Sequence, residues 1–180
     1  MTIKVTIVLL VACISIASGE PIWVEGDYRL PPFGYSIKVP HGLKGMAVDV
    51  DGIPLRRNAP GARPQHGLRI PLPSGGEVAV LGEANSFLWK NPAEGVRSAL
   101  ADEACASGTN DVSPTRVGRS LTGSKGRLVC GARVLKLLLA FRTGGGPIYW
   151  FRLETVRTHE LDDTTILDNI AASFRLIRWS

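Results

Sequence analysis

The chain has 180 residues, and its 21 lysines and arginines outnumber its 16 acidic residues, giving a formal net charge of +5 at neutral pH. Hydrophobic residues make up 44% of the chain, which is ordinary for a globular protein with a real core and excludes a chain too polar to fold. Beyond residue 19, no apolar run approaches the roughly 18 residues of a membrane-spanning helix, which excludes a further spanning segment.

Residues 1–19 have the pattern of a secretory signal peptide. Lys4 precedes the apolar run 5–16, and the small residues Ala17, Ser18 and Gly19 follow it. At about 1.5 Å per residue, this run extends only about 18 Å, which is too short for a hydrocarbon core of roughly 30 Å. We therefore predict cleavage before Glu20, a single domain over residues 20–180, and a periplasmic or secreted protein.

Cys13 offers an alternative fate for the same segment. The run Leu10-Val11-Ala12-Cys13 is similar to the lipobox of bacterial lipoproteins, in which the cysteine is lipidated and becomes the new N-terminus. The apolar run continues past Cys13, which favours ordinary cleavage. Only lipidation at Cys13 would tether the protein to a membrane. The sequence contains no Asn-x-Ser/Thr glycosylation motif with an allowed middle residue, and this favours a bacterial envelope.

The first half of the domain alternates apolar and polar residues with a period of two, which is typical of half-buried strands. We expect strands at residues 33–39, 46–50, 68–72 and 78–81. A turn at Asp51-Gly52 and an irregular surface loop at 56–66 separate the second strand from the third. Further along the chain, we expect the glycine-flanked segment 123–126 to be a flexible hairpin loop.

A helix is predicted to begin at Asn91. This residue is a good N-cap, Pro92 suits the first helical position, and Glu94 stands three residues after the cap. The expected helix ends near Gly108, which places Cys105 at its end, while Cys130 falls in a strand expected at 128–132. In an oxidising compartment these two cysteines form a predicted disulfide. Two unrelated buried thiols remain the alternative, because sequence spacing does not show that the side chains meet.

The last third of the chain predicts a long hairpin over residues 133–158, followed by a helix that begins at Asp162 or Asp163. Ile166, Ile170 and Phe174 form the apolar stripe of that helix. Strands, a helix, more strands and a terminal helix together predict an α+β domain with an antiparallel sheet covered by two helices.

The order of these elements resembles a known family. The strand 33–40 reads Phe-x-Tyr-x-Ile-x-Val-Pro, and the closing helix ends in Ala-Ser-Phe-Arg at 172–175. With the capped middle helix and the long hairpin, the chain looks like the PsbP-like α/β/α sandwich group of small exported proteins. The resemblance implies a small, non-enzymatic binding, accessory or chaperone-like protein.

Positive charge gathers on the hairpin region. The residues between Asp111 and Glu154 include no acidic residue, but they include eight lysines and arginines. We therefore expect a non-catalytic protein, for example of the immunity or inhibitor type, that binds an acidic protein or an anionic envelope component through a basic hairpin face. The expected contact residues are Arg127, Arg133, Lys136 and Arg142. The alternative is that nearby acidic residues, including Glu154 and Glu160, balance these cations. Nucleic acid is not expected as a partner, because export separates the chain from it.

No catalytic, metal or cofactor motif is complete. His159-Glu160 lacks the second histidine of a zinc-protease helix, and Asp49-x-Asp51-Gly52 lacks the remaining ligands of a calcium loop. We therefore expect neither a metal ion nor a cofactor. A small periplasmic hydrolase that uses His41 or His159 with a nearby carboxylate is the alternative function.

Overall fold

The computed structural model describes residues 19–57, 63–84, 89–103, 105, 111–141 and 146–177. Three predictions fall on other residues: the signal peptide apart from Gly19, the lipidation of Cys13, and the contact residue Arg142. Within the described ranges, no helix has the length and apolar character needed to cross a membrane.

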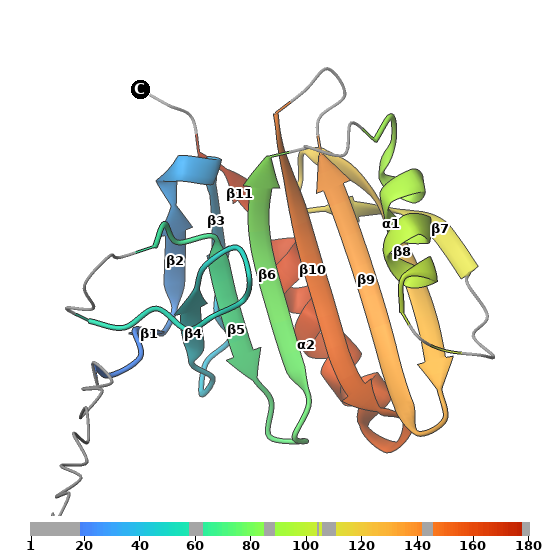
Figure 1. The fold of residues 1–180 in the computed structure, drawn as a ribbon, viewed down its shortest axis with the longest axis horizontal. Coiled ribbons are helices and arrows are strands. Elements are labelled where there is room, and N and C mark those ends of the chain that lie inside the picture. Colours follow the sequence, from blue (N-terminus) through green and yellow to red (C-terminus); the bar gives the residue numbers. More distant parts are fainter. Residues whose placement is uncertain are drawn as a thin grey trace, which may run out of the picture.

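The strands form two antiparallel sheets (Figure 1). The larger sheet has eight strands in the order β1-β4-β5-β6-β10-β9-β8-β7, and the smaller has three in the order β11-β3-β2. The strands of the larger sheet are β1 (Trp23–Val24), β4 (Gly45–Val48), β5 (Gly67–Pro71), β6 (Glu77–Ala84), β7 (Asp111–Val117), β8 (Leu121–Cys130), β9 (Arg133–Phe141) and β10 (Pro147–Val156). The strands of the smaller sheet are β2 (Asp27–Leu30), β3 (Tyr35–Lys38) and β11 (Arg175–Leu176). The predicted α+β fold is confirmed, and the smaller sheet is an addition to it.

Two helices lie on opposite faces of the larger sheet (Figure 1). Helix α1 (Pro92–Ala101) packs on β8 and β9 with one apolar cluster that includes Val96 and Leu100. Helix α2 (Glu160–Ser173) and the smaller sheet share the other, larger cluster, in which Tyr35, Phe151 and Phe174 are fully buried. Two short 3-10 turns, η1 (Pro31–Phe33) and η2 (Arg157–His159), precede β3 and α2.

The start of α1 is as predicted. The Asn91 side chain accepts the Glu94 amide N–H at 3.0 Å, and the Glu94 carboxylate in return accepts the Lys90 amide at 3.0 Å. The helix ends at Ala101, earlier than expected, so Cys105 follows it instead of lying in its last turn. Cys105 and Cys130 form the predicted disulfide, which joins the segment after α1 to the end of β8, with their Cα atoms 5.7 Å apart.

The expected flexible loop at 123–126 is wrong, because these residues lie inside β8. A Cβ atom on Gly126 would come within 2.6 Å of both Val96 and Leu100 of α1. A Cβ atom on Gly123 would come within 2.7 Å of the Leu139 carbonyl oxygen on β9. The glycines therefore serve close packing of a helix and a neighbouring strand, and not a turn.

Other predicted boundaries also move, including the strand expected at 128–132, which is the end of the longer strand β8. The strand expected at 33–39 is shorter, because Pro31–Phe33 form the 3-10 turn η1, and Gly34 then adopts a positive φ of 66° that redirects the chain into β3. Helix α2 begins at Glu160, before the expected caps Asp162 and Asp163. Asp163 is instead 3% exposed, and its carboxylate accepts hydrogen bonds from the hydroxyls of Ser74 and Thr155. It therefore joins α2 to β10 and to the β5–β6 turn.

Candidate functional site

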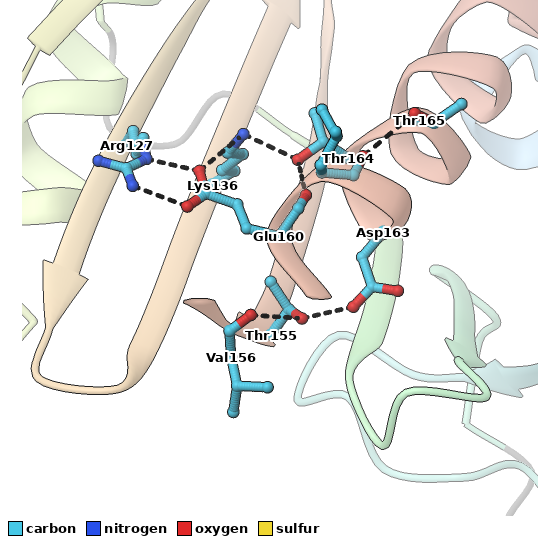
Figure 2. Close-up of polar contacts among 9 residues, drawn as sticks. Arg127, Lys136, Thr155, Val156, Glu160, Asp163, Thr164 and Thr165 are labelled. Atoms are coloured by element: carbon cyan, nitrogen blue, oxygen red, sulfur yellow. Dashed lines mark hydrogen bonds and ion pairs between the residues drawn. The ribbon is translucent and has the colours of Figure 1, made fainter. Parts of the chain in front are cut away.

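Strands β8 and β9 place Arg127 and Lys136, two of the expected contact residues, directly opposite each other. Arg127 on β8 and Lys136 on β9 are cross-strand partners, so both side chains lie on the face that α2 covers in part. Glu160, the first residue of α2, meets them there. The Arg127 Nε and Nη2 donate to the two Glu160 carboxylate oxygens at 2.6 and 2.7 Å, and the Lys136 Nζ lies 3.0 Å from the first of these oxygens (Figure 2).

Thr164, one turn further along α2, completes this network. Its hydroxyl accepts a hydrogen bond from the Lys136 Nζ at 2.8 Å and donates to the Glu160 carbonyl oxygen (Figure 2). The Lys136 ammonium therefore has two fixed acceptors on α2, and its side chain is only 22% exposed. This contact network orients both cations.

The hydrogen bonds from Arg127 hold the pKa of Glu160 at about 2, well below the ordinary glutamate value, and Lys136 acts in the same direction. Burial opposes this shift but does not cancel it. Glu160 is therefore ionised throughout the neutral and mildly acidic range, and it is a permanent counterion for the two cations.

An open groove lies beside this network, between α2 and strands β7 to β9. The cavity measures about 250 Å³. Lys125, Arg127 and Lys136 line its strand side, while Thr164, Leu167 and Asp168 line its helix side. We call this the α2 groove. Leu138 and Leu167, both in the buried core cluster, form an apolar floor beneath the charged groups.

Lys125 distinguishes the α2 groove from a fully neutralised surface. It is exposed, it lies on the same face of β8 as Arg127, and it forms no ion pair with another residue in the described part of the chain. The groove also contains the carboxylates of Asp111 and Asp168. The Nη1 of Arg127 forms no hydrogen bond with a described residue, although Asp111 lies opposite Arg127 in the register and attracts its charge. This donor and the Lys125 ammonium are the groups left for a ligand.

Arg133 does not join the other expected contact residues. It lies on the opposite face of β9, where its Nε donates to Glu154 at 2.7 Å and its Nη2 lies 3.3 Å from Glu103. Arg152 on β10 shares both of these acidic partners. The structure thus places Arg127 and Lys136 together and separates Arg133 from them. Much of the positive charge predicted for the hairpin face is paired within the fold.

The described histidines form no ion pair with a described carboxylate. His41 and His159 are exposed and form no ion pair with a described acidic residue. His66 packs on the Phe33 ring, with its Nδ1 3.1 Å from the Gly82 carbonyl oxygen. The described part of the chain brings together no group of three His, Cys, Asp or Glu side chains that could hold a metal ion.

The Asp49 carboxylate accepts hydrogen bonds that stabilise a turn. Its carboxylate accepts the backbone N–H groups of Asp51 and Ile53 at 2.9 Å, and Arg63 donates to its other oxygen at 2.8 Å. Asp49 is 1% exposed, so these bonds satisfy a buried charge and close the turn expected at Asp51-Gly52.

Neutralising Glu160 tests the network directly. Because its folded pKa of about 2 lies below the ordinary value of 4.5, its contribution to stability is present above pH 4.5 and is lost as the pH falls toward 2. We expect Glu160→Gln to lower the free energy of unfolding by about 1–2 kcal/mol at pH 7, since the partly exposed partners are screened by solvent. Urea unfolding at pH 7 and pH 3 measures this difference, which should shrink at the lower pH.

Glu25→Gln is the matched control for Glu160→Gln. Glu25 pairs with Lys44 at 2.6 Å, but both side chains are 63% exposed, so this substitution should change stability by less than about 0.5 kcal/mol. A Glu160→Gln effect that is the same size at both pH values would contradict the proposed charge network.

No protein family model matches the sequence, and no curated protein sequence is significantly similar to it. A solved structure is similar in fold. The solution structure of cyanobacterial PsbP from Synechocystis superposes with a TM-score of 0.55 at 14% sequence identity, covering 93% of this chain and 98% of that one. A crystal structure of a protein from Bacteroides thetaiotaomicron gives a TM-score of 0.43 at 10% identity, covering 86% of this chain and 49% of the other. The chain therefore has the PsbP-like fold that its sequence resembles.

Proposed function

We propose that the protein is an exported, non-catalytic binding protein whose α2 groove takes an acidic segment of a partner protein. The observation that carries the proposal is the row of cations Lys125, Arg127 and Lys136 along one wall of an open cavity of about 250 Å³. A partner carboxylate would approach Lys125 and the free Nη1 of Arg127, and an aliphatic neighbour would cover Leu138 and Leu167. An inhibitor or immunity role is one form that such binding takes.

The internal counterion makes the wall rigid and selective. Glu160 already holds Arg127 and Lys136 in place, so a ligand meets oriented donors and loses little side-chain entropy on binding. Together with Glu160, the carboxylates of Asp111 and Asp168 balance the three cations of the groove. Only a ligand whose acidic groups meet the cations while avoiding these two carboxylates fits well, which favours specificity over general attraction to anions.

Export is part of this proposal. The disulfide between Cys105 and Cys130 suits an oxidising compartment such as the periplasm, and the sequence of residues 1–19 suits translocation. A chain isolated from its native host that still contains residues 1–19 and lacks a lipid on Cys13 would overturn this step.

The binding test uses a labelled acidic peptide in which glutamate and leucine alternate. We expect binding that weakens with salt and that shifts the amide NMR signals of Lys125, Thr164 and Asp168. Lys125→Glu should weaken binding about tenfold, because it replaces the unpaired cation with a repelling charge.

Arg116→Glu is the matched control for the peptide experiment. Arg116 is an exposed cation on β7 without an ion pair to a described residue, and its register places it on the other face of the sheet from Lys125. If Arg116→Glu and Lys125→Glu weaken binding equally, charge alone accounts for the attraction, and the groove proposal fails. Vesicles with anionic lipid form a second arm: if they bind in a Lys125-dependent way and the peptide does not, the partner is the envelope surface and not a protein.

A further inference from the structure

A second cluster of cations lies on the outer face of the smaller sheet, away from the α2 groove. Strand register places Arg29, Ser36 and Arg175 side by side on β2, β3 and β11. In the adjacent row, Leu30 and Tyr35 are buried in the core. Because side chains alternate between the faces of a strand, the row of Arg29, Ser36 and Arg175 faces outward.

The spacing of the strands places these cations around one hydroxyl group. Neighbouring strands lie about 4.8 Å apart, so the Cα atoms of Arg29 and Arg175 are separated by about 10 Å, with Ser36 between them. Lys38 lies two residues along β3 from Ser36, about 7 Å away on the same face. A cavity of about 310 Å³ opens at this position, lined by these four residues and by Ser173.

Internal contacts do not neutralise this cluster. Within the described ranges, Arg29 and Lys38 form no ion pair, and the Ser36 hydroxyl forms no hydrogen bond. Asp27, opposite Lys38 in the register, is the acidic residue that lines the cavity. The three cations lie on one face at Cα separations of about 7–10 Å, so an anion bound between them would reduce their mutual repulsion. Arg127 and Lys136 differ in this respect, because Glu160 already pairs with them.

Arg175 is held in a fixed position at the rim. Its Nη1 donates to the carbonyl oxygens of Ala172 at 3.0 Å and Phe174 at 2.8 Å. These bonds satisfy carbonyl groups at the end of α2 and offset the partial negative charge there. The Nε and Nη2 groups remain for a ligand. Lys38 is also positioned, because its backbone N–H donates to the Ser173 hydroxyl oxygen at 2.9 Å.

We propose that this surface, the Ser36 site, binds a phosphate group. The residues of the Ser36 site are Arg29, Ser36, Lys38 and Arg175. Two guanidinium groups, an ammonium and a hydroxyl offer donors from several directions, which suits the tetrahedral set of oxygens on a phosphate better than the planar pair of a carboxylate. The phosphate can be free, part of a small ester, or the headgroup of a lipid. The Ser36 site shares no lining residue with the α2 groove and does not depend on the function proposed for it.

Titration with inorganic phosphate at constant ionic strength tests the Ser36 site. We expect saturable shifts of the amide NMR signals of Ser36, Lys38 and Arg175, and weaker effects from acetate. Arg29→Gln should weaken phosphate binding about tenfold, because it removes one charged donor pair and breaks no ion pair or side-chain hydrogen bond among the described residues. Vesicles containing phosphatidylglycerol, compared with phosphatidylcholine alone, form the second arm and show whether a lipid headgroup is the source of the phosphate.

Arg97→Gln is the matched control, since Arg97 is an exposed cation on α1 and lies outside this cavity. Loss of phosphate or phosphatidylglycerol binding in Arg29→Gln but not in Arg97→Gln supports the site. The proposal is overturned if neither probe binds, if acetate binds as well as phosphate, or if both variants lose binding equally.

Discussion

Replacing Phe174 with alanine is expected to lower the free energy of unfolding by about 3–5 kcal/mol, with a fall in melting temperature of about 10 °C or more. The Phe174 ring is fully buried. It stacks on Tyr35 of the smaller sheet at 5.6 Å between ring centroids, and it meets Tyr149 and Phe151 of β10 edge-on at 4.9 and 5.9 Å. The substitution would leave a cavity where the two sheets and α2 meet. Urea unfolding and calorimetry measure the loss.

Two further variants control for the Phe174→Ala result. Leu161→Ala, also at α2, changes a side chain that is 81% exposed and should change stability by less than about 0.5 kcal/mol. Phe174→Leu should cost clearly less than Phe174→Ala, because it retains more of the buried volume. A Phe174→Ala loss below about 1 kcal/mol would show that the aromatic cluster is not the joint between the sheets.

Removal of the disulfide is expected to have an effect of similar size. The bond between Cys105 and Cys130 closes a loop of about 26 residues, which in the chain-entropy description stabilises the folded state by about 3.5 kcal/mol. The double variant Cys105→Ser/Cys130→Ser should therefore melt about 10 °C below the oxidised protein. Calorimetry of both proteins, with and without reductant, measures the difference.

Reductant gives the control for the disulfide prediction. It should lower the melting temperature of the unmodified protein toward that of the double variant and leave the double variant unchanged. The intact mass of protein from its native host should rise by about 2 Da on reduction. Equal melting temperatures for the oxidised protein and the double variant would contradict a stabilising role for the bond.

The sequence was sufficient for elements whose local signals agree with their packing. The Asn91 cap begins α1 as its side chain predicts, and the alternating apolar residues of the long hairpin are buried, as are Ile170 of α2 and Phe174 just after it. The disulfide was also predictable, because the expected removal of residues 1–19 would leave one pair of cysteines. These features rest on short-range patterns, which sequence reasoning detects well.

The elements that were missed are short or depend on distant partners. Strand β2 has only four residues and β11 only two, and they pair through β3 although they come from opposite ends of the domain. The exposed edge strand β7 contains Pro114 and little apolar periodicity. In β8, Gly123 and Gly126 resembled turn residues because local reasoning does not reveal that α1 and β9 pack against them.

The candidate site was predictable in part. The sequence identified Arg127 and Lys136, but it grouped them with Arg133, although residues 133 and 136 differ by an odd number and so lie on opposite faces of one strand. If this alternation had been applied strictly, Arg133 would have been assigned to the opposite face from Lys136. The roles of Glu160 and Thr164 depend on how α2 crosses the sheet, which no local pattern specifies.

The smaller sheet is assembled from residues near both ends of the domain, and this sets the order in which the molecule can be completed. Arg29 and Ser36 are synthesised early, whereas Arg175, their neighbour in the same row, follows almost all of the domain. The ribosome holds the most recently added residues in its exit tunnel, so β11 cannot pair with β3 until synthesis has passed Leu176. The row of Arg29, Ser36 and Arg175 is thus completed only after Leu176 has left the exit tunnel, when pairing of β11 with β3 joins segments that are far apart in the sequence.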